Sequence, residues 1–198
     1  DEEGLRSSLA TLRSGGRLVV VAGDVTDHVR AEAERQGKHA TEMLVERCAP
    51  ASVHGIDPSD EQLAYARTRV ASRIAHFQKA DAMALPFPDN SFDVVSSGLF
   101  AHHLSPEDVV AFAKEALRVA RTAVLINDLI RHRLHLALVY AGVPMYRSRL
   151  TRHDAPASVR QAYTPEEMCT MLKLTSAAKI EVSSHYLFRM GVIAWKHA

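Results

Sequence analysis

Short apolar runs alternate with amphipathic stretches along the first two thirds of the chain. The apolar runs are rich in β-branched residues and predict buried strands at residues 17–23, 51–57, 73–81, 92–98 and 122–128. The stretches between them predict helices, among them 25–36, 38–48 and 105–120. Strands that alternate with helices form a parallel sheet covered on both faces, so we predict an α/β fold.

Three predicted helices begin with a capping signature. In each, a serine or threonine stands three residues before a side chain that can complete a capping box: Ser59 with Gln62, Ser105 with Asp108, and Thr164 with Glu167. Pro106 occupies the first helical position after Ser105, where proline is favoured.

The last third of the chain changes character. Residues 129–142 predict a helix with a basic start, residues 143–163 an irregular polar stretch, and residues 164–174 a capped helix. Residues 179–187 and 188–197 predict two tightly joined strands, which should pair antiparallel at an edge of the sheet. No repeat or low-complexity linker interrupts the sequence, so we expect a single domain over residues 1–198.

The composition fits one compact domain and narrows its partners. The chain has 198 residues, 47% of them hydrophobic, and can bury a sizeable core. A net charge of +1 gives no indication of bulk nucleic-acid or membrane-surface binding. Cys48 and Cys169 match no metal or disulfide spacing, which is typical of reduced thiols in a cytosolic protein. No apolar run approaches the length of a membrane span and the acidic start differs from a signal peptide, so we expect a cytoplasmic protein.

Four aspartates stand at or just past predicted strand ends, namely Asp24, Asp57, Asp81 and Asp128. In open α/β sheets, ligands bind beyond the carboxyl ends of the strands. An aspartate that ends the second strand can accept two hydrogen bonds from a ribose diol, so Asp57 predicts a nucleoside site. The alternative is that Asp57 caps the following helix, although Ser59 already provides a cap.

Asp81 stands one strand further along the chain. Its carboxylate can accept from an exocyclic amine while the N–H of Ala82 donates to a ring nitrogen, and together they would recognise adenine. The alternative is a turn aspartate that bonds its own backbone.

Four segments, in this order and spacing, resemble class I S-adenosylmethionine-dependent methyltransferases. They are VHGIDPSDEQLAYAR, KADAMALPFPDNSFDVV, GLFAHHLSPEDVVAFAKEALRVA and FRMGVIAWK. The similarity is closest to ubiquinone and menaquinone C-methyltransferases and to small-molecule O-methyltransferases, and it covers residues 17–198. It implies a three-layer Rossmann-like sandwich, in which a mostly parallel seven-stranded sheet has an antiparallel last strand.

The resemblance implies S-adenosyl-L-methionine as the cofactor, with its ribose on Asp57 and its adenine on Asp81 and Ala82. The methionine part would lie near three residues that end the fourth strand: Ser96, Ser97 and Gly98. The remaining predicted cofactor contacts flank the first two strand ends and are Gly23, Asp24 and Pro58.

The chain departs from the family pattern in the first motif. The family has a G-x-G-x-G loop after the first strand, where the backbone approaches the cofactor closely. This chain has no G-x-G and only Gly23 at that place. Gly37 has the usual spacing to Asp57, but the residues before it are too polar for the first strand. Three explanations stay open: a remodelled loop that still binds cofactor, an engineered or incomplete sequence in this region, and weakened or lost binding.

Candidate catalytic residues follow the fourth and fifth strands. Methyl transfer chiefly needs alignment of donor and acceptor, and it needs a base only where the acceptor must lose a proton. His102 and His103 stand where donor and acceptor should meet, and a histidine can deprotonate a hydroxyl near neutral pH. Asp128 can orient a substrate hydroxyl or position a histidine. The alternatives are a packed loop for the histidines and a helix cap for Asp128.

In similar enzymes the region after the fifth strand builds the acceptor pocket, which here corresponds to about residues 129–163. Its candidate substrate contacts are Arg131, His135, Tyr140, His153, Asp154 and Tyr163. Such side chains can hold a carboxylate or a polyphenol, and any one of them can equally lie on a solvated helix face. We expect no metal site, because no ligand spacing occurs.

The sequence therefore predicts an enzyme that transfers a methyl group from S-adenosylmethionine to a small organic acceptor. A phenolic or polyketide hydroxyl and a quinone-type ring carbon are the acceptors we expect. A nicotinamide-dependent oxidoreductase would also use Asp57, but its G-x-G-x-x-G is absent. A degenerate fold that binds a ligand or partner without catalysis stays open because of the altered glycine loop. We expect no nucleic-acid partner and no membrane span, and leave a homodimer open.

Overall fold

The computed structural model describes residues 17–22, 52–69, 73–146, 149–185 and 188–197. These residues include a seven-stranded sheet of order β3-β2-β1-β4-β5-β7-β6. The strands are β1 Arg17–Ala22, β2 Ser52–Asp57, β3 Ala75–Lys79, β4 Phe92–Gly98, β5 Ala120–Leu129, β6 Lys179–His185 and β7 Arg189–Trp195. The pairs β3-β2, β2-β1, β1-β4 and β4-β5 are parallel, whereas β7 is antiparallel to both β5 and β6. The predicted α/β sheet with an antiparallel last strand is confirmed.

The described helices are α4 Asp60–Arg69, α5 Pro106–Val119, α6 Arg133–Gly142, α7 Arg149–Gln161 and α8 Pro165–Leu172, with short 3-10 helices η1 Ala101–His103 and η2 Val143–Met145. Helix α5 buries an apolar face that includes Phe112 and Leu117, and it packs against β4, β5 and α8. Phe92, Ile126 and Met168 are fully buried in the same core. Burial of side chains of this size is the main stabilising contribution to the sheet–helix interface.

The predicted caps are present. Ser105 accepts a hydrogen bond from the Asp108 N–H at 3.2 Å. Thr164 and Glu167 form a complete capping box, in which each side chain accepts from the other residue's N–H. Each cap satisfies donors that the first helical turn would otherwise leave without partners.

The prediction of an irregular stretch over residues 143–163 is wrong. After η2, the chain forms α7, which contains Pro156. Thr151, Ala155 and Val159 recur every four residues and are buried, so they form the apolar stripe that stabilises α7. The helix predicted over residues 129–142 begins later, at Arg133, because β5 continues to Leu129.

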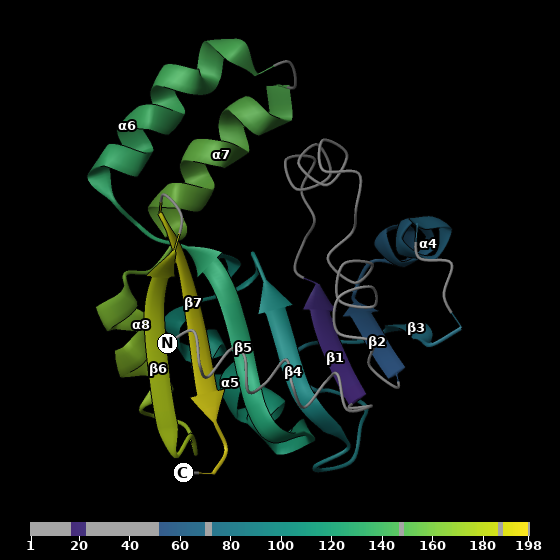
Figure 1. The fold of residues 1–198 in the computed structure, drawn as a ribbon. Coiled ribbons are helices and arrows are strands. Elements are labelled where there is room, and N and C mark those ends of the chain that lie inside the picture. The colour runs from purple at the N-terminus through teal and green to yellow at the C-terminus, as the bar shows by residue number, and fades with distance from the viewer. Residues whose placement is uncertain (1–16, 23–51, 70–72, 147–148, 186–187, 198) are drawn as a thin grey trace.

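The parallel strands all direct their carboxyl ends to one rim of the sheet, and α6 and α7 stand side by side above it (Figure 1). Any residue that directly follows one of these strands therefore lies at this rim. The helices predicted over 25–36 and 38–48, together with Gly23, Asp24, Gly37 and Cys48, lie outside the described residues.

Candidate functional site

Asp57 closes β2 at the rim and is only 4% exposed. Its Oδ1 accepts a hydrogen bond from the Ser59 N–H at 2.7 Å, and Ser59 Oγ accepts from the Gln62 N–H at 3.4 Å. Asp57 thus orders the residue that precedes α4, whereas the cap bond itself comes from Ser59. A carboxylate offers about four lone-pair sites, so this bond leaves acceptor capacity for a ribose diol. The ribose contact itself stays a prediction.

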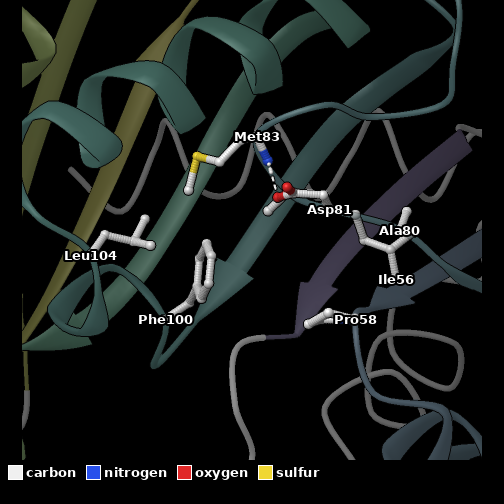
Figure 2. A pocket seen from close by; sticks show the side chains of 8 residues that line it. Ile56, Pro58, Ala80, Asp81, Met83, Phe100 and Leu104 are labelled. Atoms are coloured by element: carbon white, nitrogen blue, oxygen red, sulfur yellow. Dashed lines mark hydrogen bonds between the residues drawn. The ribbon is translucent and has the colours of Figure 1, made fainter.

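A cavity of about 170 Å³ lies beside this strand end (Figure 2). Its lining joins the ends of β2 and β3 to the segment after β4, and consists of Ile56, Pro58, Ala80, Asp81, Ala82, Met83, Phe100 and Leu104. The predicted residues Pro58, Asp81 and Ala82 are thus brought together. The volume is below the 300–1,000 Å³ usual for whole ligands, so the cavity suits one ring of a larger molecule (on the order of a purine).

Asp81 forms the turn that its alternative predicted. Its Oδ1 accepts from the Met83 N–H at 2.9 Å, and its carbonyl oxygen accepts from the Ala84 N–H at 3.1 Å. This turn presents Asp81 and Ala82 side by side in the cavity wall. A turn and a ligand contact are therefore compatible at this position.

Helix α5 holds the loop that follows Asp81. Glu115 accepts from the Leu85 N–H at 2.7 Å, and Arg118 donates to the carbonyl oxygens of Leu85 and Phe87. Arg118 also pairs with Glu115 and with Asp89. The hydrogen bond from Arg118 is the largest cause that lowers the pKa of Glu115. This network holds the loop that directly follows the cavity residues Asp81, Ala82 and Met83.

His102 and Asp128 form a buried pair at the ends of β4 and β5. His102 Nδ1 lies 2.6 Å from Asp128 Oδ1, and the side chains are 4% and 1% exposed. Asp128 also accepts from the backbone N–H of His102 at 3.2 Å and of Leu129 at 2.7 Å. A carboxylate accepts only, so it holds the Nδ1–H tautomer of the imidazole and leaves Nε2 as an acceptor.

The turn between β4 and this pair has an unusual backbone. Leu99 has a φ of 56°, which for a leucine costs about 1–2 kcal/mol, and its N–H donates to the Asn127 carbonyl oxygen. The turn carries Phe100 into the cavity wall and His102 onto Asp128. The rings of His102 and His103 lie 4.0 Å apart, so both predicted histidines occupy the same corner.

Ser97 and Gly98 end β4 beside this corner. Ser97 is 1% exposed, and its Oγ has no hydrogen-bond partner within the described residues. A buried hydroxyl of this kind is a candidate ligand contact, since buried polar groups are nearly always paired. Its contact with the methionine part of a cofactor stays a prediction.

The predicted substrate residues do not gather at one place. Tyr163 donates to the Leu104 carbonyl oxygen at 2.6 Å and so fixes a residue of the cavity wall. Burial is the main cause that raises the pKa of Tyr163. Arg131 pairs with Glu167 and donates to the Ala162 carbonyl oxygen.

His135 and Tyr140 lie on α6, away from the cavity lining. The His135 ring stacks on Phe188 with centroids 4.7 Å apart, and burial is the main cause that lowers its pKa. The Arg160 guanidinium lies over the Tyr140 ring, 5.4 Å from the ring centroid, and donates a hydrogen bond to the Tyr140 hydroxyl. His153 and Asp154 pair on α7, with the histidine largely exposed. The role of these residues in acceptor binding is untested.

Sequence reasoning missed five residues of the cavity wall: Ile56, Ala80, Met83, Phe100 and Leu104. Each stands within a few residues of a predicted strand end. Their closeness to a strand end was the available signal. Apolar side chains are common at such positions, however, so the signal does not distinguish a residue that lines a cavity from one in the ordinary core.

Comparison with known proteins shows similarity to methyltransferases. Residues 35–126 match the family model described as a methyltransferase domain. A demethylmenaquinone methyltransferase from Roseiflexus sp. is 27% identical over 132 residues, which are 60% of this chain and 55% of that protein. One from Thermus thermophilus is 46% identical over 56 residues, 27% of this chain and 26% of that protein. The chain thus spans about half, or less, of these curated relatives.

Solved structures show the same fold. A SAM-dependent methyltransferase from Aquifex aeolicus has a TM-score of 0.60 at 18% identity, with 98% of this chain and 88% of that chain covered. Magnesium protoporphyrin IX methyltransferase from Synechocystis, solved with bound SAH, has a TM-score of 0.61 at 15% identity, with coverage of 98% and 83%.

These comparisons confirm the resemblance to class I S-adenosylmethionine-dependent methyltransferases and the predicted fold class. None of the helices in the described part of the chain has the length and apolarity needed to cross a membrane.

Proposed function

We propose that this chain, which resembles class I S-adenosylmethionine-dependent methyltransferases, binds S-adenosyl-L-methionine and methylates a small organic acceptor. The observation that carries the proposal is the continuity of the rim. One cavity wall runs from Pro58, directly after Asp57, to Phe100 and Leu104, which flank the histidine corner. A nucleoside held at one end would therefore place the rest of the cofactor towards the other.

The residues present fit the cofactor. Asp57 is a buried carboxylate with acceptor capacity for a ribose, and Asp81 and Ala82 border a ring-sized, largely apolar cavity. Ser97 Oγ is a buried hydroxyl at the end of β4, which β1 separates from β2 in the sheet. When bound, the cofactor supplies an electrophilic methyl group on a sulfonium. The residues of this chain hold and align it, which is the larger part of catalysis for such a transfer.

The His102–Asp128 pair supplies the base that a hydroxyl acceptor requires. Asp128 fixes the imidazole so that Nε2 can take the proton from a phenol. A phenolate is more electron-rich both at its oxygen and at the adjacent ring carbon. The same deprotonation therefore serves transfer to oxygen or to carbon; in the second case the ring carbon afterwards releases its proton to solvent, and the restored phenolate takes back the proton held by the imidazole.

The acceptor class follows from the base and from the relatives. A histidine base suits an acidic hydroxyl on an aromatic ring. The curated relatives are named for demethylmenaquinone, whose reduced ring carries such hydroxyls. Among the acceptors predicted from the sequence, we therefore favour a quinone-type ring in its reduced form. Arg131, His135, Tyr140 and Tyr163 remain candidates for its contacts.

A turnover assay with naphthohydroquinone tests this proposal. The chain should convert S-adenosylmethionine to S-adenosylhomocysteine only when the hydroquinone is present. His102→Gln should lower kcat by about 10²–10⁴-fold, the usual contribution of a general base, with little change in the KM for the cofactor.

Substitution of His76, a histidine on β3 outside the cavity lining, provides a matched control, and His76→Gln should leave kcat unchanged within about twofold. Full activity of His102→Gln would refute base catalysis. Cofactor binding without turnover on any phenolic acceptor would instead favour a binding module.

A further inference from the structure

Helix α6 and the following η2 expose an apolar stripe. Leu134, Leu138 and Met145 are 55%, 53% and 84% exposed. Leu134 and Leu138 are spaced by four residues and so lie on one face of α6, which Ala141 continues, and Met145 follows in η2. No residue of α6 is buried. The stripe is therefore not used to pack α6 against the rest of the described chain.

The longer segment from residue 131 to 161, which contains α6, η2 and α7, carries a concentrated positive charge. By sequence, residues 131–161 contain six arginines and one aspartate, with no lysine or glutamate, a net charge of +5 against +1 for the whole chain. Arg133, Arg152 and Arg160 are exposed. Asp154 lies beside the His153 ring, with 3.0 Å between Oδ1 and Nδ1. The net charge of the whole chain does not reflect this basic segment, because the rest of the chain is acidic overall.

Arginine and aromatic side chains border the stripe directly. Arg160 of α7 lies over the Tyr140 ring, and Tyr140 is itself 44% exposed. Helices that lie in the headgroup region of a bilayer combine these features: an apolar face that enters the acyl boundary, cations beside it and tyrosine at the interface. The charge selects a negatively charged surface.

We propose that α6 and η2 dock this chain on the surface of an anionic lipid bilayer. Leu134, Leu138 and Met145 enter the headgroup–acyl boundary, while Arg133, Arg152 and Arg160 contact lipid phosphates. Helices α6 and α7 stand at the carboxyl rim of the sheet, so docking brings the rim to the membrane (Figure 1). The inference does not rest on methyl transfer, although docking would bring the rim close to an acceptor dissolved in the lipid.

Vesicle flotation tests the proposal. The chain should float with phosphatidylcholine vesicles that contain about 30% phosphatidylglycerol, and should bind pure phosphatidylcholine at least about tenfold more weakly. Raising NaCl from about 0.1 M to about 0.5 M should weaken binding to the mixed vesicles, because salt screens the attraction.

Matched variants separate the two contributions. Leu134→Ser with Leu138→Ser should weaken binding to mixed vesicles by at least about tenfold, since two leucines would lose their apolar contact. Arg133→Ser should weaken it by about fivefold. The controls are Leu174→Ser, at a leucine that is 65% exposed beyond α8, and Lys114→Ser on α5; both should bind like the unchanged chain.

Four outcomes would overturn the proposal. They are absence of flotation, equal binding to both kinds of vesicle, equal loss in Leu174→Ser, and self-association in place of lipid binding. The last would appear in sedimentation as a dimer that Leu138→Ser dissociates, and it would assign the stripe to a second copy of the chain.

Discussion

Replacing Asp128 by asparagine tests how much the buried His102–Asp128 pair contributes to stability. The Asp128 carboxylate accepts three hydrogen bonds, two on Oδ1 and one on Oδ2. An asparagine has the same shape but only one acceptor oxygen. With that oxygen at the Oδ1 position, the backbone N–H of His102 faces an NH₂ group. With the amide reversed, the Leu129 N–H loses its acceptor and the imidazole must move its proton to Nε2. Either orientation leaves a buried donor without a partner.

The magnitude follows from these contacts. A buried unpaired donor costs about 1–3 kcal/mol, and loss of the charge from the 2.6 Å bond adds about 1 kcal/mol. We expect Asp128→Asn to lower the free energy of unfolding by about 2–4 kcal/mol, measured by urea denaturation with far-UV circular dichroism.

Asp154→Asn is the matched control, because its histidine partner is 85% exposed. It should change stability by less than about 0.5 kcal/mol. A cost below that value for Asp128→Asn would refute the account of the pair. Where turnover is measured, Asp128→Asn should also lower kcat by about 10²-fold or more.

Three further predictions concern stability. Arg118 lowers the pKa of Glu115 below 4.5, so the pair stabilises the fold above that pH, and this contribution is lost as the pH falls through the folded pKa. In Glu115→Gln, the free energy of unfolding, measured by urea denaturation, should therefore fall less steeply below about pH 4.5. Burial lowers the pKa of His135 below 6.5, so the unfolded chain takes up the proton first and stability declines as the pH falls below that value. The thermal stability of His135→Gln should therefore decline less steeply with falling pH. An identical pH profile for the variant and the unchanged chain would contradict the lowered pKa of His135. A Cβ at Gly55 would lie 2.7 Å from the Phe77 ring, so Gly55→Ala should cost about 1–3 kcal/mol in urea denaturation, and Gly55→Ala with Phe77→Leu should recover part of it.

The positions of the strands and the starts of the capped helices were predictable because their signals are local. The alternation of apolar runs with capped helices defined the sheet, and the caps at Ser105 and Thr164 formed as expected. Helix α7 was missed because Pro156 and the surrounding charges obscured a stripe of small buried residues. Pro156 lies in the interior of α7, where proline is unfavourable, and tertiary burial of this stripe overrides that low propensity.

The site was harder to predict because its pairs are distant in sequence. Asp128 was predicted either to orient a substrate hydroxyl or to position a histidine, and its separation of 26 residues from His102 gave no means to choose between the two. Asp57 and Asp81 each proved to make a local turn contact. A local contact and a ligand contact use different lone pairs, so the sequence could not decide between them. The net charge of the whole chain does not show the basic character of residues 131–161, because the remaining residues are acidic overall.

Calorimetric titration with S-adenosylmethionine tests the central claim most directly. The chain should bind the cofactor, and Asp57→Ala should weaken binding by at least about tenfold, since it removes charge-assisted hydrogen bonds to the ribose. Asp60→Ala, on the exposed start of α4, should bind like the unchanged chain. Absence of binding at millimolar cofactor, or an affinity that Asp57→Ala leaves unchanged, would contradict the account.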